Sequence, residues 1–232
     1  MQAETPGALP PERSGRVQSV TRTLALLEAL AEHDEGVALS VLARQVGLPL
    51  STTHRLLTTM EERRFVSFDA RRMRWSIGLQ AFAVGQAFGR ARDLVRLGRP
   101  IMRLLMESSR KTVNLSIADG SFILYLAQVC PARTIVSFGR PGIRVPMHES
   151  AAGRGVMAHW SAPEVESFIV RNGVRQRAEN AVAARATLLA QLETARSRGF
   201  ARDEQDYCAG TRCVASPIFN EWGEPIGALS IS

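Results

Sequence analysis

Hydrophobic positions near the start of the chain recur at helical spacing. From Val17 to Gly36 they fall at steps of three and four residues, which predicts an amphipathic helix that ends at the Asp34-Glu35-Gly36 turn. The stripe consists of Val17, Val20, Leu24, Leu27 and Ala31. A second short helix is predicted from Ser40 to Val46, with Ser40 as its N-cap and Gly47 able to end it. A third is predicted from Ser51 to Arg64, with Ser51 as its N-cap, and together the last two favour a helix-turn-helix.

Two short β-prone runs follow the third helix. They extend from Phe65 to Phe68 and from Met73 to Ile77, and they flank a tip that carries Arg71 and Arg72. This pattern predicts a hairpin, which makes the N-terminal region a winged helix-turn-helix. The sequence from Gly78 to Ser109 is mostly compatible with helix, and a connector helix is predicted at residues 79–98.

The second half of the chain alternates short strands with helices. Strands are predicted at Val113–Ile117, Phe122–Val129, Thr134–Phe138, Arg212–Phe219 and Pro225–Ser232. Helices are predicted at Ala152–Trp160, Pro163–Arg171 and Arg185–Arg198, the last with Leu188, Leu189, Leu192 and Ala195 facing inward. Helices around an antiparallel sheet indicate the α+β class.

Length and composition support two globular domains. The 232 residues are 45% hydrophobic and 22% charged, which is typical of a water-soluble protein. We expect a flexible arm at residues 1–15, a winged helix-turn-helix domain at 16–78, the connector at 79–98 and a second domain at 99–232. The chain has neither an apolar run long enough for a membrane span nor a signal-peptide core near Met1, so a cytoplasmic location without membrane contact is expected.

Charge and cysteine content narrow the chemistry. A net charge of +7 favours a polyanionic partner. The three cysteines, Cys130, Cys208 and Cys213, form no CxxC pair, so they resemble neither a disulfide framework nor a zinc site. We therefore expect reduced thiols and neither a metal nor a cofactor.

Residues on the third helix and the hairpin suit double-stranded DNA. Thr52, Arg55 and Thr59 share the outward face of that helix, where short polar or basic side chains can approach base edges. The remaining candidates can contact phosphates from the start of the helix, the hairpin or the first helix: Ser51, His54, Arg71, Arg72, Arg74 and Arg22. One such unit covers few base pairs, so an operator requires a symmetric dimer, for which the connector is the natural interface. A protein-interaction module with solvated arginines is the alternative interpretation.

From Val17 onward the sequence closely resembles the IclR family of bacterial transcriptional regulators. The resemblance rests on SVTRTLALLEAL (19–30), LARQVGLPLSTTHRLL (42–57), RVPMHESAAGRGVMA (144–158), GFARDEQDYCAGTRCVASPIF (199–219) and GALSIS (227–232). It implies a winged helix for DNA, a connector helix, a GAF-like effector domain, and dimers that commonly pair into tetramers. Within the motifs, Glu149 stands where the family tends to have a small residue and Arg154 replaces a frequent Lys. The family fold usually continues through a final helix, which leaves open whether the natural chain extends past Ser232.

The resemblance also implies an effector pocket in the second domain. Its residues carry over to Thr134, Ser137, Ala151, Ala152, Asp203, Cys213, Ser230 and Ser232, and its usual ligands are small organic acids or metabolites of aromatic catabolism. From the residues themselves, small side chains open a helix at Ser150 whose N–H groups suit a carboxylate. Ser230 and Ser232 alternate along one strand and so share a face. Whether the effector favours or releases DNA stays open, and so does the choice between repressor and activator.

Three other functions fit parts of the chain. Gly153 to Ala158 matches a G-x-G-x-x-A dinucleotide fingerprint, but Pro146 to Glu149 precede it where a buried strand is needed. A Cys/His enzyme would pair Cys208 or Cys213 with His148 or His159, without a G-x-S-x-G elbow as support. A nonspecific architectural DNA binder would leave more than half of the chain without a role. We expect a regulator and not an enzyme.

Overall fold

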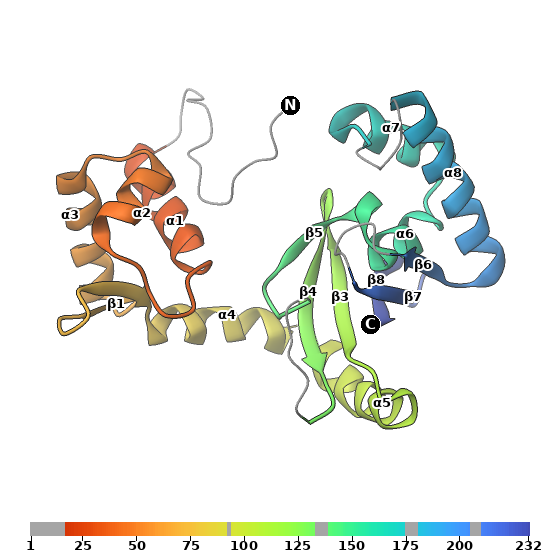
Figure 1. The fold of residues 1–232 in the computed structure, drawn as a ribbon, viewed down its shortest axis with the longest axis horizontal. Helices are drawn as coiled ribbons and strands as arrows, with labels where there is room; N and C mark the ends of the chain where they lie inside the picture. Colours follow the sequence, from red (N-terminus) through yellow and green to blue (C-terminus); the bar gives the residue numbers. More distant parts are fainter. Residues whose placement is uncertain (1–16, 92–93, 133–138, 175–180, 205–209) are drawn as a thin grey trace. The chain divides into compact units, whose positions relative to one another are not determined.

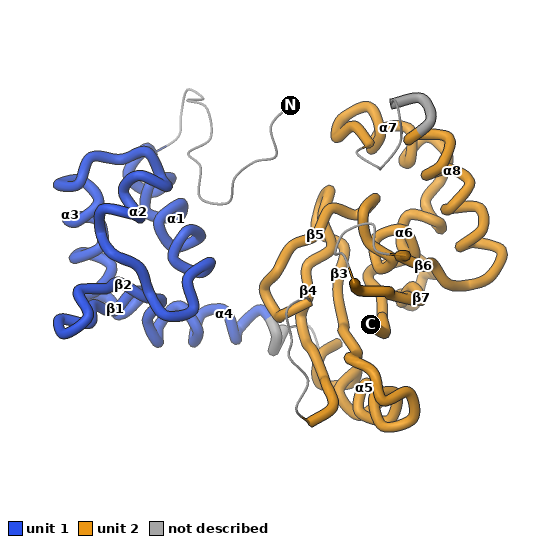
Figure 2. Tube along the Cα trace, viewed as in Figure 1, with its two compact units in different colours: residues 1–92 blue, residues 93–232 orange. Residues whose placement is uncertain are grey.

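A computed structural model describes residues 17–91, 94–132, 139–174, 181–204 and 210–232. The chain forms two compact units, unit 1 (residues 1–92) and unit 2 (residues 93–232) (Figure 2). Unit 1 is mainly helical, and unit 2 is built on a six-stranded antiparallel sheet (Figure 1). The predicted α+β class is confirmed. Among the described residues, none of the helices has both the length and the apolar character that crossing a bilayer requires.

Unit 1 contains the predicted helix-turn-helix with shifted helix starts. Its helices are α1 (Gln18–Leu30), α2 (Leu39–Val46) and α3 (Leu50–Glu62). The predicted caps Ser40 and Ser51 are wrong, because the N-caps are Ala38 and Pro49. Leu39 packs partly against the core and begins α2 one residue early, while the N–H and Oγ1 of Thr53 both donate to the Pro49 carbonyl and close the first turn of α3 there. Gly47 ends α2 at φ +71°, as predicted.

The apolar stripe of α1 is not its buried face. Val17, Val20 and Leu24 are each more than half exposed. The core of unit 1 instead takes Ala25, Leu26, Ala29 and Leu30 from this helix. The helix also ends at Leu30, before the predicted Asp34-Glu35-Gly36 stop. Unit 1 therefore presents apolar side chains to solvent along one side of α1.

The predicted hairpin follows α3. Strands β1 (Val66–Asp69) and β2 (Arg74–Ile77) pair antiparallel, and Trp75 on β2 is almost fully buried in the core of unit 1. Trp75 also exchanges backbone hydrogen bonds of 2.8 and 2.9 Å with Val37, in the loop between α1 and α2. The hairpin is thus a wing joined to the helices at its base.

Two helices occupy the segment predicted as a connector. They are α4 (Leu79–Ala91) and α5 (Leu94–Ser109), so the predicted connector at residues 79–98 runs through all of α4 into the start of α5. The described part of α4 is highly exposed, although it carries large apolar side chains: Leu79, Phe82, Val84 and Phe88.

Unit 2 contains one sheet with the strand order β5-β4-β3-β8-β7-β6. Its strands are β3 (Val113–Asp119), β4 (Phe122–Val129), β5 (Arg144–Pro146), β6 (Ala201–Glu204), β7 (Arg212–Phe219) and β8 (Pro225–Ile231). The short edge strands β5 and β6 were not predicted, because three or four residues give too little alternation to detect. The strand predicted at Thr134–Phe138 lies outside the described residues.

Helices cover both faces of this sheet. After a 3-10 turn, η1 (Met147–Glu149), the helices α6 (Ala151–Met157), α7 (Ala162–Asn172) and α8 (Ala181–Arg198) share one core with the sheet. On the other face, α5 lies against the sheet, and its Met102 is buried with Val113 and Leu115 of β3 and Ala127 of β4. The inward position predicted for Leu189 is wrong, since this side chain is 37% exposed, whereas Leu188, Leu192 and Ala195 are buried.

Leu57→Ala tests the core of unit 1. The side chain is fully buried, so we expect its truncation to lower the free energy of unfolding by about 2–5 kcal/mol. Leu50→Ala on the same helix removes the same atoms from a site that is 54% exposed, and should cost less than about 0.5 kcal/mol. Urea denaturation followed by circular dichroism measures both, and equal losses would contradict the packing described.

Candidate functional site

The outward face of α3 carries the predicted DNA-contacting side chains. Ser51, His54, Arg55 and Thr59 are exposed and Thr52 is half-buried, whereas Thr53, Leu57 and Met60 are buried. The Thr59 hydroxyl donates 2.9 Å to the Arg55 carbonyl, so its oxygen remains able to accept. Among the residues that the structure describes, no side chain caps the start of α3, which leaves its first N–H groups for an outside acceptor. The helix therefore offers a polar and basic outer face over an apolar inner face.

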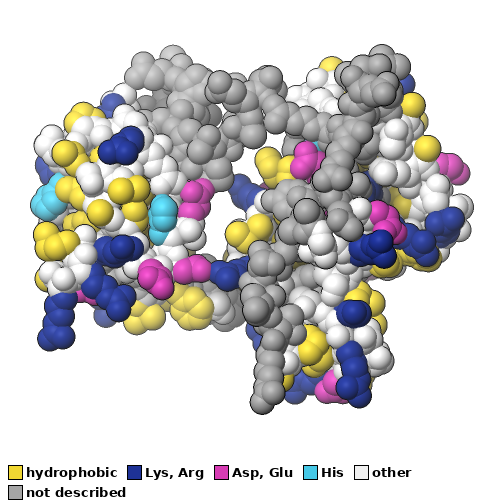
Figure 3. Space-filling model, viewed as in Figure 1, with side chains coloured by type: hydrophobic (Ala, Val, Ile, Leu, Met, Phe, Trp, Pro, Cys, Tyr) yellow, Lys and Arg dark blue, Asp and Glu magenta, His cyan; other side chains and the backbone are white. Residues whose placement is uncertain are grey.

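The tip of the wing is shaped by Asp69. Its Oδ1 atom accepts the N–H groups of Arg71 at 2.9 Å and Arg72 at 3.2 Å, and both arginine side chains are exposed. Arg74 differs, because its Nη1 atom donates 2.9 Å to the Gly36 carbonyl and ties the wing to the α1–α2 loop. Arg22, on α1, is half-buried. Figure 3 shows Lys and Arg side chains over the hairpin region of unit 1.

Two contacts hold α3 and the wing in a fixed relation. The Phe68 N–H donates 3.1 Å to Oε1 of Glu61, which lies in the last turn of α3. The His54 ring meets the buried Trp75 ring edge-on, with centroids 6.2 Å apart. Helix α3 and the wing are consequently parts of one rigid surface.

The predicted effector residues on strands share one face of the sheet. Asp203 pairs with Cys213 across β6 and β7, and Ser230 pairs with Ala215 across β7 and β8. Asp203, Cys213 and Ser230 are each less than 7% exposed. Ser232 lies two residues beyond Ser230 and exchanges backbone hydrogen bonds with Thr112. These side chains form a buried polar face on the side of the sheet that α6 covers, and we call it the polar face.

The start of α6 closes over this side of the sheet. Ser150 caps the helix, since its Oγ atom accepts the Gly153 N–H at 3.0 Å. Ala151 and Ala152 are buried, and their N–H groups precede the first hydrogen bond within the helix. Thr134 and Ser137, predicted on the lining, lie outside the described residues. The structure thus brings together the six effector candidates that it describes on β6, β7, β8 and α6.

Two side chains of this region were missed as site residues. Asn114 on β3 is fully buried opposite Ser230. Arg154 on α6 is 1% exposed, with Nη1 donating 3.0 Å to the His148 carbonyl and Nη2 donating 2.6 Å to the Arg202 carbonyl. Asn114 could have been noticed as the polar residue that shares a strand face with Ser116 in an otherwise apolar run. The buried guanidinium brings positive charge close to Asp203 and Cys213, as both arginine and aspartate influence the thiol.

Hydrogen bonding on the polar face is incomplete. Within the described part of the chain, Ser230 Oγ, Ser232 Oγ and Asn114 Nδ2 are buried without a hydrogen-bond partner of normal geometry. Burial raises the pKa of the Cys213 thiol, although the neighbouring hydroxyls of Ser232 and Ser230 act in the opposite direction. Buried polar groups of native proteins are normally paired, so these groups make the polar face a candidate binding site.

The alternative chemistries receive little structural support. The G-x-G-x-x-A interpretation is wrong, because Gly153 to Ala158 lie in and just after α6, which follows η1 and an antiparallel edge strand. Gly153 is required for packing, since a Cβ there would overlap the Met147 backbone. A Cys/His enzyme needs a thiolate as its nucleophile, whereas the raised pKa of Cys213 favours the neutral thiol. Partial burial, together with the Arg196 guanidinium, lowers the pKa of His159. Cys208 lies outside the described residues, and among the described ones no cluster of His, Cys, Asp or Glu could hold a metal.

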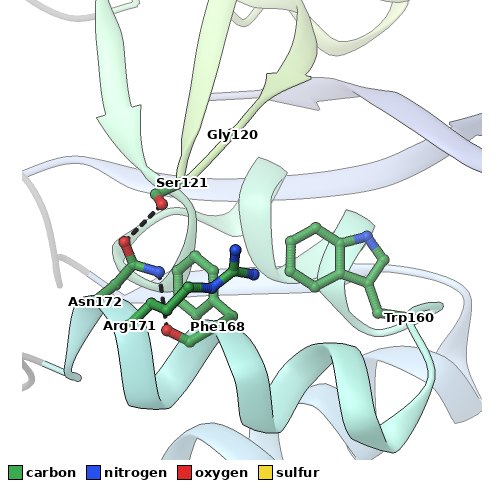
Figure 4. Close-up of a pocket in the computed structure, with 6 residues that line it drawn as sticks. All are labelled: Gly120, Ser121, Trp160, Phe168, Arg171 and Asn172. Atoms are coloured by element: carbon green, nitrogen blue, oxygen red, sulfur yellow. Dashed lines mark hydrogen bonds between the residues drawn. The ribbon is translucent and has the colours of Figure 1, made fainter.

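A separate small pocket of about 170 Å³ lies where the β3–β4 turn approaches α7 (Figure 4). The Arg171 side chain extends toward the Trp160 ring, and its Nε atom donates 3.1 Å to the Ser167 carbonyl. None of the predicted effector residues that the structure describes lines it; the described lining consists of Gly120, Ser121, Trp160, Phe168, Arg171 and Asn172. This pocket is distinct from the polar face.

Family models match both parts of the chain. The model described as the IclR helix-turn-helix domain matches residues 19–70, and the model described as bacterial transcriptional regulator IclR C-terminal matches residues 86–232. The acetate operon repressor of Salmonella typhimurium is 40% identical over 229 residues, which are 98% of this chain and 84% of that protein. The transcriptional repressor IclR of Escherichia coli is 40% identical over 221 residues, which are 94% of this chain and 81% of that protein.

Solved structures show the same fold. An IclR transcriptional regulator from Alicyclobacillus acidocaldarius matches with a TM-score of 0.80 at 22% identity, covering 93% of this chain and 87% of that one. An IclR homologue from Microbacterium hydrocarbonoxydans, complexed with 4-hydroxybenzoate, matches with a TM-score of 0.74 at 22% identity, covering 90% of this chain and 87% of that one.

The environment of Cys213 predicts an unreactive thiol at neutral pH. In a variant that retains only this cysteine, Cys130→Ser with Cys208→Ser, alkylation by iodoacetamide should follow a pH profile shifted upward from that of the same variant unfolded in urea. The reason is that burial raises the pKa of the Cys213 thiol and only the thiolate reacts. Overlapping folded and unfolded profiles would contradict this, and a downward shift would favour the Cys/His enzyme.

Proposed function

This chain belongs to the IclR family of bacterial transcriptional regulators, and from that premise we propose that unit 1 binds a DNA operator under the control of a small organic acid bound by unit 2. The observation that carries the first part is the outer face of α3, where Ser51, Arg55 and Thr59 are exposed above a buried apolar face. A helix with this division can lie in the major groove while its inner face stays in the protein core.

The wing contacts phosphate beside that groove. Arg71 and Arg72 extend from a tip that Asp69 keeps in one conformation, so their charges lie at a set distance from α3. Arg74 acts mainly by positioning the wing, because it is engaged with the Gly36 carbonyl. Ser51, Thr52 and His54 approach the backbone at the start of α3, and Arg22 does so from α1. These contacts give affinity that falls with salt, whereas Arg55 and Thr59 read bases.

A homodimer provides the second half-site. The apolar side chains exposed on α4, together with the stripe of Val17, Val20 and Leu24 on α1, are the surface expected of an interface between two copies. Such a dimer would place two α3 helices on a palindromic operator. Pairing of two dimers into a tetramer remains a prediction from the family resemblance.

The polar face of unit 2 takes the effector. The proposed pocket is lined from the sheet by Ser230, Ser232 and Cys213, and by Asp203 on the edge strand β6. Ala151 and Ala152 line it from the start of α6. The nearby buried guanidinium of Arg154 favours an anion. The relative that binds 4-hydroxybenzoate supports an organic acid as the ligand class. Thr134 and Ser137 stay on the proposed lining.

Control requires that the acid bind two states of the assembly with different affinities, because only that difference can change DNA occupancy. Two relatives that are 40% identical to the chain are repressors, which supports repression as the direction of control. We propose that the acid lowers operator occupancy and so relieves repression.

Arg55→Ala should separate DNA binding from effector binding. Loss of an exposed guanidinium on α3 should weaken binding to a duplex selected by the wild-type protein from random sequence by about 10- to 100-fold. Arg198→Ala removes the same charge from the exposed end of α8 and should leave this affinity within about twofold. Mobility-shift titration measures both, and unchanged affinity for the Arg55 variant would overturn the role of α3.

Ser230→Ala should weaken the effector response and preserve DNA binding. Removing this buried hydroxyl should reduce the affinity for the acid about tenfold, since one hydrogen bond to the ligand is lost. Ser216→Ala is the matched control. Ser216 is an exposed residue of the neighbouring strand β7, and its hydroxyl donates 3.0 Å to the Gly199 carbonyl. Calorimetry on both variants provides the affinities, and equal values for them would contradict the assigned pocket. Asp203→Ala is expected to act in the same direction as Ser230→Ala.

A further inference from the structure

Asn114 lies on the polar face beside Ser230. The two residues are directly opposed on the neighbouring strands β3 and β8, and both are 0% exposed. Val113 and Leu115 point to the α5 side of the sheet, so Asn114 points to the α6 side, as Ser230 does. Directly opposed side chains have Cβ atoms about 5 Å apart, which lets both reach one atom placed between them.

The Asn114 amide presents its donor group to this site. Gln128 Nε2 donates 2.8 Å to Asn114 Oδ1, so the amide oxygen already has a partner. Asn114 Nδ2 and Ser230 Oγ are buried, and neither has a hydrogen-bond partner of normal geometry within the part of the chain that the structure describes, although the Ser230 hydroxyl lies near the Cys213 thiol. An NH2 group can only donate, so the missing partner is an acceptor.

Ser116 on the same strand shows that the fold can provide a hydrogen-bond partner for a buried hydroxyl. Ser116 is two residues from Asn114 on the same face and is also fully buried, yet its Oγ atom donates 3.2 Å to the Ala228 carbonyl. In contrast to Ser116, Asn114 and Ser230 keep buried donors without a partner of normal geometry among the described residues, and the Ser232 hydroxyl two residues beyond Ser230 does so as well. A buried donor without an acceptor costs free energy, and such a cost is recovered where a ligand binds.

The chain also covers the amide. At Gly139 a Cβ atom would lie 2.9 Å from Asn114 Oδ1 and 3.3 Å from Nδ2, so only the backbone of a glycine can approach this closely. The φ of +74° at this position also favours glycine. Because Gly139 lies against it, the Asn114 amide is enclosed rather than open to solvent.

We propose that Asn114 is a ligand-binding residue that, together with Ser230, donates a hydrogen bond to an oxygen of the bound acid that can only accept. This assignment rests on the proposed effector control, because it places the acid on the polar face. A site with these two donors binds acids that place a carboxylate or carbonyl oxygen beside Asn114 and Ser230 more tightly than ligands that place a hydrogen-bond donor there. Asn114 thus determines specificity by hydrogen-bond direction.

Asn114→Asp is the sharpest test, because it keeps the shape of the side chain and the oxygen that accepts from Gln128 but replaces the donor. The probes are acetate, pyruvate, benzoate and 4-hydroxybenzoate, and the measurements are calorimetry and the thermal shift of the full chain between pH 5.5 and 8.5. For an acid that the wild type binds, affinity should fall about 30-fold or more at pH 8.5. Binding should recover as the pH falls, since a protonated carboxyl can donate again.

Ser116→Ala is the control, because it removes a buried hydroxyl from the same strand face whose partner is a backbone carbonyl. It should lower the thermal midpoint of the free protein while leaving acid affinity within about twofold at every pH. Asn114→Asp should leave the thermal midpoint of the free protein near the wild-type value at low pH, and should weaken acid binding at pH 8.5. Asn114→Leu, which cannot donate at any pH, should stay weak throughout the range.

The outcomes separate this assignment from the proposed function. A wild-type chain that binds none of the four acids overturns effector control by such acids, and this proposal with it. Wild-type binding with undiminished affinity in Asn114→Asp overturns only the role of Asn114. Weak binding in that variant without recovery at low pH, accompanied by loss of thermal stability, would show that Asn114 is structural and would likewise overturn its assignment.

Discussion

Close packing of α6 on the sheet is the constraint on which unit 2 depends. Gly153 has no room for a side chain beside the Met147 backbone, and Gly155 lies against Ala215 of β7. Ala151 and Ala152 are buried at the start of the same helix. Because these residues are small, the helix approaches the strands closely enough to remove their polar groups from water. Larger residues here would lift the helix and expose the polar face.

Enclosure changes what those polar groups can do. A hydroxyl or amide open to solvent exchanges one water for a ligand at little net gain, whereas a buried donor without a partner gains a full hydrogen bond when a ligand arrives. Among the described residues, Ser230 and Asn114 are in the second situation, and the guanidinium of Arg154 adds a buried positive charge nearby. The proposed preference for small acids follows from this combination of size, charge and donor direction.

Unit 1 uses rigidity for a different purpose. Trp75 is packed into its core, and Glu61 receives the Phe68 N–H, so α3 and the wing cannot change their spacing independently. A surface of this kind recognises DNA through fixed geometry, and its occupancy can then be regulated by how two copies are placed. In the proposed dimer, the exposed apolar side chains of α4 are the surface through which such placement would be controlled.

Local sequence signals were sufficient to predict most of the helices, the long strands and the family. Helical periodicity and Gly47 marked the helix-turn-helix, alternation marked the long strands β4 and β7, and separated motifs indicated the family. They could not identify the buried side of α1, because Val17, Val20 and Leu24 are as apolar as the residues that fill the core. They also missed the helix starts at Leu39 and Leu50, which depend on packing and on hydrogen bonds to Pro49. Only the tertiary structure placed Asn114 opposite Ser230, because strand order and register join residues more than a hundred positions apart.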